Sequence, residues 1–220
     1  MPEIDTEVRY SRQKDLVPLE TLQDKTVTVI GVGAIGRQVA IQLAAMGVPK
    51  IQLIDFDTVE TGNLAAQGFF ESDLGKPKVE AVAELLKSIN SEVEIEVVND
   101  RFRRRMNTGE IIFCCVDDMD IRDLIFTATQ NTAVLFIDGR MSAEVLRVLS
   151  VFNLDSQNHY RTTLFSSEDA YRGSCTAKTT IYSSNVAAGI MTGTMAKWLR
   201  ELPIDKDVQY NLLTNEISVE

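Results

Sequence analysis

The sequence predicts an α/β fold: a doubly wound, mostly parallel Rossmann-like sheet with an antiparallel C-terminal extension. Three observations predict it. In the first half of the chain, short runs of apolar and β-branched residues alternate with segments whose apolar residues recur at helical spacing. A glycine-rich turn joins the first such run to the first such segment. In the second half the alternation stops, and runs typical of antiparallel strands flank one long helix.

The first predicted strand covers residues 26–30, where the run Thr-Val-Thr-Val-Ile is typical of a buried strand. Residues 34–46 follow as a predicted helix, because four apolar side chains share one stripe: Ile35, Val39, Leu43 and Met46. Gly47 then stands where a helix ends in a left-handed residue.

The rest of the first half continues this order. We expect a strand over 51–54 closed by Asp55, a loop over 57–74, a helix from Pro77 to about 89, strands over 93–98 and 111–116, a helix over 119–130 and a strand over 133–137. The run at 111–116 is continuously apolar, which is typical of a central parallel strand.

The second half predicts antiparallel strands over 144–152 and 160–165, a helix over 183–201 and a terminal edge strand over 210–219. In the helix, one face is mostly apolar although Thr194 interrupts it: Ala187, Ile190, Met191 and Trp198. The simplest assembly is a parallel sheet that antiparallel strands extend.

Composition restricts the function further. The chain has 220 residues and a formal net charge of −10, so we expect one domain that binds neither nucleic acid nor an anionic membrane. Its three cysteines include no C-x-x-C pair, so no zinc site of the usual spacing is expected. No apolar run is long enough to span a membrane, and we expect a cytoplasmic protein.

The glycine-rich turn predicts a nucleotide site. Gly31, Gly33 and Gly36 form a G-x-G-x-x-G pattern between a strand and a helix, with Ala34 as the first helical residue. The glycines permit a tight turn and close approach of a phosphate to the backbone, and the helix N-terminus attracts anions. Asp55 ends the next strand, where a carboxylate can hold ribose hydroxyls. This pattern alone does not separate NAD from ATP.

Several other motifs make that choice. The segment after Asp55 carries Asp57, Asn63 and Gln67, and the next predicted helix begins near Lys78. Cys-Val-Asp-Asp at 115–118 ends the fourth strand, and Arg-Tyr-Ser-Arg-Gln occupies 9–13. In this order the motifs resemble the ThiF/MoeB/HesA superfamily of ubiquitin-activating-enzyme-like adenylyltransferases, from Arg9 through the helix after Ser183.

The resemblance implies ATP-dependent adenylation of the C-terminal carboxylate of a small ubiquitin-like or sulfur-carrier protein, or of a peptide. It implies one adenylation domain over 1–220, with a nucleotide-binding half at about 22–140 and the antiparallel strands and C-terminal helix at about 141–220. The residues matching Asp55, Lys78 and Asp117 bind ATP and Mg²⁺ in that family. The residue matching Arg12 reaches into the neighbouring subunit's site, which implies a homodimer.

The residue types suit these roles. Lys78 offers a point charge to phosphates, Asp117 an oxygen ligand to a hydrated magnesium ion, and Asn63 and Gln67 neutral hydrogen-bonding groups. Each also has an ordinary explanation. Lys78 can be a solvated surface lysine, Asp117 or its neighbour Asp118 can cap the helix near 119, and Arg12 can be one more exposed charge.

The sequence departs from the family at one catalytic position. The loop of that family usually carries an arginine before the glutamine, and here Ala66 precedes Gln67. Because a phosphate-binding arginine can contribute about 10³-fold in rate, activity is in question. Arg12, Lys76, Lys78 or the basic run at 103–105 are alternatives, although such a run is usually solvated. Two other functions stay open: a nucleotide-binding scaffold without activity and an NAD-dependent oxidoreductase.

Four side chains complete the candidates. Cys175, in Gly-Ser-Cys-Thr, matches a place where some ubiquitin-activating relatives carry a nucleophilic cysteine, and its ordinary explanation is a small packing residue. Cys114 and Cys115 lie in a predicted buried strand and are expected to be inert. His159, the only histidine, lies in a polar stretch predicted to be a surface turn, and receives no role.

Overall fold

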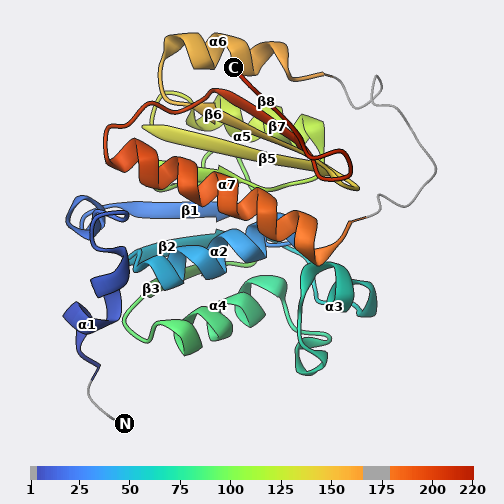
Figure 1. Ribbon diagram of the computed structural model, residues 1–220. Coiled ribbons are helices and arrows are strands. Elements are labelled where there is room, and N and C mark those ends of the chain that lie inside the picture. The colour runs from blue at the N-terminus through green and yellow to red at the C-terminus, as the bar shows by residue number, and fades with distance from the viewer. Residues whose placement is uncertain (1–3, 166–178) are drawn as a thin grey trace.

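The computed structural model describes residues 4–165 and 179–220 (Figure 1). In these residues one sheet has the strand order β3-β2-β1-β4-β5-β6-β7-β8. Its strands are β1 Thr26–Ile30, β2 Lys50–Ile54, β3 Glu94–Val98, β4 Ile111–Cys114, β5 Leu135–Ser142, β6 Val145–Val151, β7 Asp207–Asn211 and β8 Glu216–Val219. The first five in this order pair in parallel, and the last three join antiparallel, as the sequence predicts.

The α-helices are α1 Thr6–Tyr10, α2 Ala34–Met46, α3 Thr61–Gln67, α4 Lys78–Ile89, α5 Met119–Thr129, α6 Leu154–Thr162 and α7 Ile181–Leu199. Short 3₁₀ turns occupy Ser11–Gln13, Leu19–Leu22 and Glu71–Asp73. Helices α2, α4 and α7 cover one face of the sheet, whereas α5 and α6 pack on the other (Figure 1). Among the described residues no helix is both long and apolar enough to cross a membrane.

The central strands are buried on both faces, which explains their continuous apolar runs. Val27 and Val29 of β1 face the core beneath α2, α4 and α7, while Ile30 faces the core beneath α5 and α6. Between them Thr28 is also buried, and its hydroxyl donates to Gln52 Oε1 of β2 at 2.8 Å. This two-sided burial fixes the register of β1 between β2 and β4.

The strand order places the functional end of the sheet. The chain moves from β1 to β2 on one side and returns to β4 on the other, so β1 and β4 lie at the switch point of the sheet. Ligands of such sheets bind outside the carboxyl ends of the strands at this point. Gly31, Asp55 and Asp117 all follow strands that end there.

Two predictions for the second half are wrong. Residues 160–165 are not a strand: helix α6 covers Leu154–Thr162, because Asn153 caps it in a reciprocal box with Ser156. Tyr160 packs its ring 4.5 Å from that of Phe126, so the aromatic residue that suggested a strand instead fills a core beneath a helix. His159 therefore lies on a helix and not in a turn.

Two predicted segments contain more structure than expected. The terminal strand over 210–219 is a hairpin of β7 and β8, whose turn is closed by the Asn211 side chain and by Asn215 at a φ of 56°. The predicted loop over 57–74 contains α3, which a reciprocal cap between Glu60 and Asn63 begins and Gly68 ends.

Candidate functional site

The glycine turn is packed so closely that two of its glycines, Gly31 and Gly36, are required. Gly31 has a φ of +84°, and a Cβ there would lie 2.8 Å from the Cys115 carbonyl oxygen at the end of β4. A Cβ at Gly36 would overlap the Gly31 carbonyl oxygen. The turn therefore lies directly against β4, and helix α2 begins immediately after it with free N–H groups at its first turn.

Asp55 fastens this turn to the end of β2. Its Oδ2 accepts the Val32 N–H at 2.7 Å, and its Oδ1 accepts the Asp57 N–H at 2.8 Å. The carboxylate is half-buried, and each oxygen keeps a second lone pair that can accept from a ribose hydroxyl. Asp55 therefore holds the backbone of the glycine turn beside which it is predicted to bind ribose.

Lys78 is not a solvated lysine. As the first residue of α4 it is only 6% exposed, and its Nζ lies 2.9 Å from Asp57 Oδ2. The Lys78 N–H also donates to the Asp57 carbonyl at 2.8 Å, and a β-bridge between Thr58 and Pro77 holds the two segments together. The fold thus holds a buried ammonium beside the carboxyl end of β2.

Helix α3 brings Gln67 to the glycine turn. The Gln67 side chain lies beside Gly33, with Oε1 3.7 Å from the place of a Cβ there. This Oε1 is buried and accepts no hydrogen bond from any described residue, while the Gln67 carbonyl accepts from Gln38 Nε2 at 3.0 Å. An unsatisfied buried acceptor at a phosphate-type turn fits a bound donor group. Asn63 Oδ1, by contrast, is occupied in capping α3.

The two aspartates after β4 divide their roles. Asp118 caps α5 by accepting the Ile121 N–H at 2.9 Å, which confirms that one of the pair is a helix cap. Asp117 is exposed, and its carboxylate has no partner among the described residues. Arg122 holds the backbone at this place, because its guanidinium donates to the Val116 and Gly139 carbonyls. Asp117 therefore offers free oxygen ligands at the switch point.

Arg12 lies away from this group within one chain. It is exposed on the 3₁₀ turn Ser11–Gln13, where Gln13 donates to the Met46 carbonyl at 2.7 Å and Arg9 donates to the Ile89 carbonyl. Met46 and Ile89 are the last residues of α2 and α4, whereas the glycine turn and Lys78 stand at the first turns of these helices. Arg12 is thus fixed at the opposite end of these helices from the glycine turn and Lys78 of its own chain.

The remaining predicted residues are cysteines and a basic run. Cys175 lies outside the described residues. Burial raises the pKa of both the Cys114 and Cys115 thiols, which keeps them protonated and supports their predicted inertness. The basic run at 103–105 is exposed, as predicted for a solvated face.

Sequence reasoning missed several buried charged groups, among them Asp138, Arg122 and Arg37. Asp138 of β5 is fully buried, forms ion pairs with Arg122 and Arg140, and accepts the Tyr160 hydroxyl at 3.0 Å. Arg37 of α2 is also buried, over the rings of Phe69 and Phe70. Charged residues in a helix or at a strand end suggest solvent exposure, so only the tertiary structure shows their burial.

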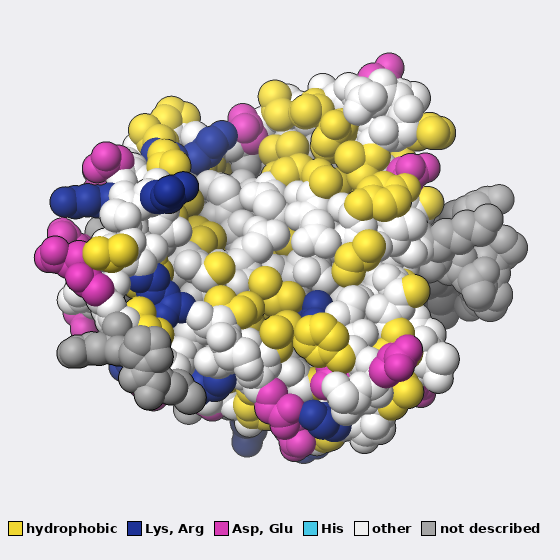
Figure 2. Space-filling view, turned by 60° about the horizontal axis from the view of Figure 1, so that its bottom comes forward, with side chains coloured by type: hydrophobic (Ala, Val, Ile, Leu, Met, Phe, Trp, Pro, Cys, Tyr) yellow, Lys and Arg dark blue, Asp and Glu magenta, His cyan; other side chains and the backbone are white. Residues whose placement is uncertain are grey.

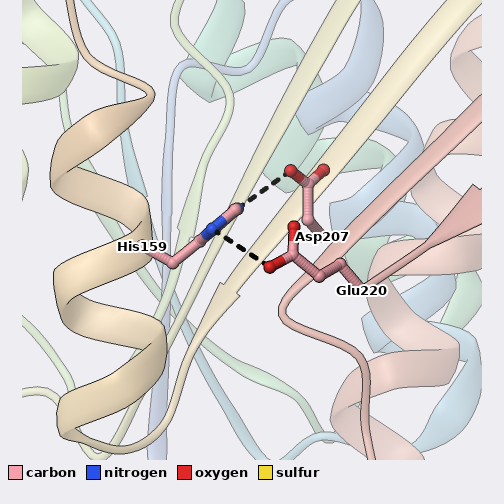
Figure 3. Close-up of side chains that lie close together, drawn as sticks. All are labelled: His159, Asp207 and Glu220. Carbon is pink, nitrogen blue, oxygen red and sulfur yellow. Dashed lines mark hydrogen bonds and ion pairs between the residues drawn. The ribbon is translucent and has the colours of Figure 1, made fainter.

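His159, Asp207 and Glu220 come from α6 and the two ends of the terminal hairpin and converge (Figure 3). His159 Nε2 lies 3.0 Å from Asp207 Oδ2, and its Nδ1 3.9 Å from Glu220 Oε1. The spacing of the three side chains would suit a metal ion, but basic side chains already pair with both carboxylates. Arg147 donates to both oxygens of Asp207, and Lys206 pairs with Glu220 at 3.1 Å. We assign the group as an ion-pair network that attaches the hairpin.

This network predicts a pH dependence of stability. Burial acts to raise the pKa of Asp207, but hydrogen bonds from Arg147 and His159 outweigh it and hold the pKa below its ordinary value. A lowered pKa stabilises the fold above the unfolded value of about 4, and this contribution is lost as pH falls through the folded value. We expect the urea midpoint to fall between pH 6 and pH 3, and to fall less in Asp207→Asn. Asp155→Asn, in an exposed pair with Lys206, is the control; equal slopes for Asp207→Asn and wild type would contradict the assignment.

Comparison with known proteins gives matches over most of the chain. The model of the ThiF family matches residues 9–218. The chain is 32% identical to molybdopterin-synthase adenylyltransferase of Salmonella typhimurium over 152 residues, which are 63% of this chain and 61% of that protein. It is also 32% identical to ubiquitin-like modifier-activating enzyme 5 of Drosophila persimilis over 156 residues, 63% of this chain and 40% of that one. The chain thus spans less than two thirds of these relatives.

Solved structures show the same fold. The crystal structure of E. coli MccB superposes with a TM-score of 0.83 over 99% of this chain and 70% of that chain, at 20% identity. The structure of MccB with ATP superposes with a TM-score of 0.80 over 96% of this chain and 71% of that chain, at 19% identity. The structure of PaaA superposes with a TM-score of 0.79 over 100% of this chain and 84% of that chain, at 20% identity. At these identities the likeness is one of fold.

Proposed function

The chain belongs to the ThiF family, and from this membership and the geometry at the switch point we propose that it is an ATP-dependent adenylyltransferase. Its acceptor would be the C-terminal carboxylate of a small ubiquitin-like or sulfur-carrier protein, or of a peptide. The names of the relatives, a molybdopterin-synthase adenylyltransferase and a ubiquitin-like modifier-activating enzyme, support this class. The solved structure of MccB with ATP, which shares the fold, supports the choice of nucleotide.

One observation carries the proposal: the buried ammonium of Lys78 at the same edge as the glycine turn and Asp117. A nicotinamide dinucleotide needs a glycine turn and a ribose-binding carboxylate, which Gly31–Gly36 and Asp55 can provide alone. A triphosphate brings about four negative charges and needs cations as well. Lys78, pre-positioned by Asp57 at 2.9 Å, is such a cation.

The reaction follows from these positions. The acceptor carboxylate attacks the α-phosphorus of ATP, the bond from this phosphorus to the bridging oxygen breaks, and pyrophosphate leaves with the electron pair. No proton transfer is required, so catalysis consists of positioning and neutralisation of charge. Lys78 would release Asp57 to hold phosphate oxygens, Asp55 the ribose, and the backbone N–H groups of the turn a phosphate.

Mg²⁺ fits the free carboxylate of Asp117, because this ion prefers oxygen ligands and keeps several waters. When bound, it would neutralise charge on the phosphate oxygens. The unsatisfied Gln67 Oε1 beside Gly33 can accept from a ribose hydroxyl or from a water of this shell.

A homodimer would complete the site with Arg12 of a second copy. The exposed side of α7 supports such an interface, because Asn185, Gly189, Gly193 and Lys197 follow at four-residue spacing and include one charge. Apart from the backbone of α7 itself, no described residue lies within 4 Å of the place of a Cβ at either glycine. Figure 2 shows that the middle of the face it draws is largely uncharged.

Ligand-dependent stability tests the proposal without a known acceptor. Mg-ATP should raise the melting temperature, corresponding to about 2.7 kcal/mol at a concentration of 100 times Kd, whereas NAD should not. The reverse result would favour the NAD-dependent oxidoreductase over the adenylyltransferase. Exchange of labelled pyrophosphate into ATP, measured with candidate carriers ending in Gly-Gly, then separates an enzyme from a scaffold: a scaffold would bind Mg-ATP without exchange against any carrier.

A further inference from the structure

A buried arginine beside the glycine turn makes no ion pair with any carboxylate in the described part of the chain. Arg37, one residue past Gly36, is 5% exposed. Its guanidinium lies 5.1 Å from the ring centre of Phe69 and 5.7 Å from that of Phe70. Among the described residues it donates no hydrogen bond and has no carboxylate within ion-pair distance. Burial lowers the pKa of Arg37, and the charge of Asp73 acts against this without forming a contact.

Such an arrangement leaves the charge poorly compensated, although the guanidinium nitrogens keep some contact with solvent. A guanidinium stays charged in a protein, and burying it without hydrogen-bonding partners is unfavourable unless an anion compensates. Aromatic faces return only part of this energy, about 0.5–2 kcal/mol. A buried cation that the described residues leave without a hydrogen bond or a contacting carboxylate is thus prepared for an anion from outside.

The surroundings of Arg37 belong to the nucleotide site. The Arg37 N–H donates to the Gly33 carbonyl at 3.0 Å, and a Cβ at Gly68 would lie 3.2 Å from Arg37 Nη1. Gly68 directly follows Gln67, whose unsatisfied Oε1 lies beside Gly33. The end of α3 therefore has an unpaired donor group on one side of Gly68 and an unpaired acceptor on the other. Phe69 is buried but Phe70 is exposed, so a ligand can displace part of the aromatic cover.

This position would explain how the chain tolerates Ala66. The resembling family usually carries an arginine before the glutamine of this loop, where this chain has alanine on α3. Arg37 brings a guanidinium to the same end of α3 from α2. We propose that Arg37 binds the phosphates of Mg-ATP and takes the place of the missing loop arginine during transfer at the α-phosphorus. This inference rests on the proposed adenylation function.

Calorimetry with two ligands tests it. Arg37→Met keeps a long apolar side chain near the two phenylalanines but removes the charge. We expect its affinity for Mg-ATP to fall roughly 10- to 150-fold, the usual effect of losing hydrogen bonds to a charged group. Affinity for adenosine, which has no phosphate, should be unchanged. Adding Ala66→Arg to Arg37→Met should restore most of the Mg-ATP affinity.

A matched control is Arg161→Met, an exposed arginine on α6 that lies 5.8 Å from the ring centre of Phe126; it should bind both ligands as wild type does. Urea unfolding gives an independent readout, because removing an unpaired buried charge should leave stability equal or greater. A lower free energy of unfolding in Arg37→Met, or an equal loss of affinity for Mg-ATP and adenosine, would show a structural role and overturn the inference. Failure of Ala66→Arg to restore Mg-ATP affinity in the double variant would also overturn it. Wild-type Mg-ATP affinity in Arg37→Met overturns it while leaving adenylation intact; a wild type that binds no Mg-ATP refutes both.

Discussion

Lys78→Ala should lose acceptor-dependent exchange of pyrophosphate into ATP by about 10²- to 10³-fold, the scale of removing one pre-positioned electrostatic group. Lys78 is the buried ammonium at the switch point, and alanine leaves the triphosphate charge to the turn, the metal and the proposed arginines. The fold should survive, because Asp57 keeps about half of its side chain exposed and can be solvated. Lys87→Ala, an exposed lysine on the same helix, is the matched control. Full exchange activity in Lys78→Ala would refute the site.

The same variant tests the shared site of the proposed dimer. Arg12→Ala should also be inactive, because each site would use Arg12 of the other copy. Mixing the two variants after dissociation should recover about a quarter of wild-type activity, since half of the dimers are mixed and each mixed dimer has one intact site. No recovery from chains that demonstrably exchange would place Arg12 outside the site.

Asp138→Ala should cost about 3–5 kcal/mol in the free energy of unfolding. Asp138 is 0% exposed and compensates two guanidinium groups, of which Arg122 is itself buried. Removing the carboxylate leaves both positive charges in the interior, which is the costly way to break a buried ion pair. It also leaves the Tyr160 hydroxyl without its acceptor. Urea unfolding at pH 7 measures the difference.

A control for this change is Asp100→Ala, because Asp100 pairs with Arg103 at the surface and should matter by less than about 0.5 kcal/mol. An unfolding free energy of Asp138→Ala within this range would contradict the assigned role. Arg122 also holds the Val116 carbonyl, so the destabilised variant should displace Asp117 and weaken Mg-ATP binding in whatever fraction stays folded.

The sequence predicted those parts of the fold that local rules determine. The glycine turn, the buried strands and the helices before Gln130 follow from periodicity and from residues with special backbone freedom. Helix α6 could not be predicted in this way, because its amphipathic pattern is weak and Tyr160 reads as a strand residue until its contact with Phe126 is known. The capping pair Asn153 and Ser156 was the signal that could have corrected it.

The candidate site was predictable in its residues but not in its charges. Spacing placed Gly31, Asp55 and Asp117 after strands that end at one edge. Whether Lys78 is solvated or buried depends on the bridge between Thr58 and Pro77, which joins segments about 20 residues apart. Arg37 could not be recognised either, because its lack of a partner is a property of the tertiary structure alone.

The attachment of the N-terminal segment has a consequence for how such an enzyme would behave in a cell. Gln13 and Arg9 fasten that segment to the last residues of α2 and α4, so one molecule cannot supply its own Arg12 without releasing both tethers. Turnover per chain would then fall on dilution, once copies separate, while each chain stays folded and able to hold nucleotide. Abundance itself would act as the switch, with no dedicated regulatory domain needed.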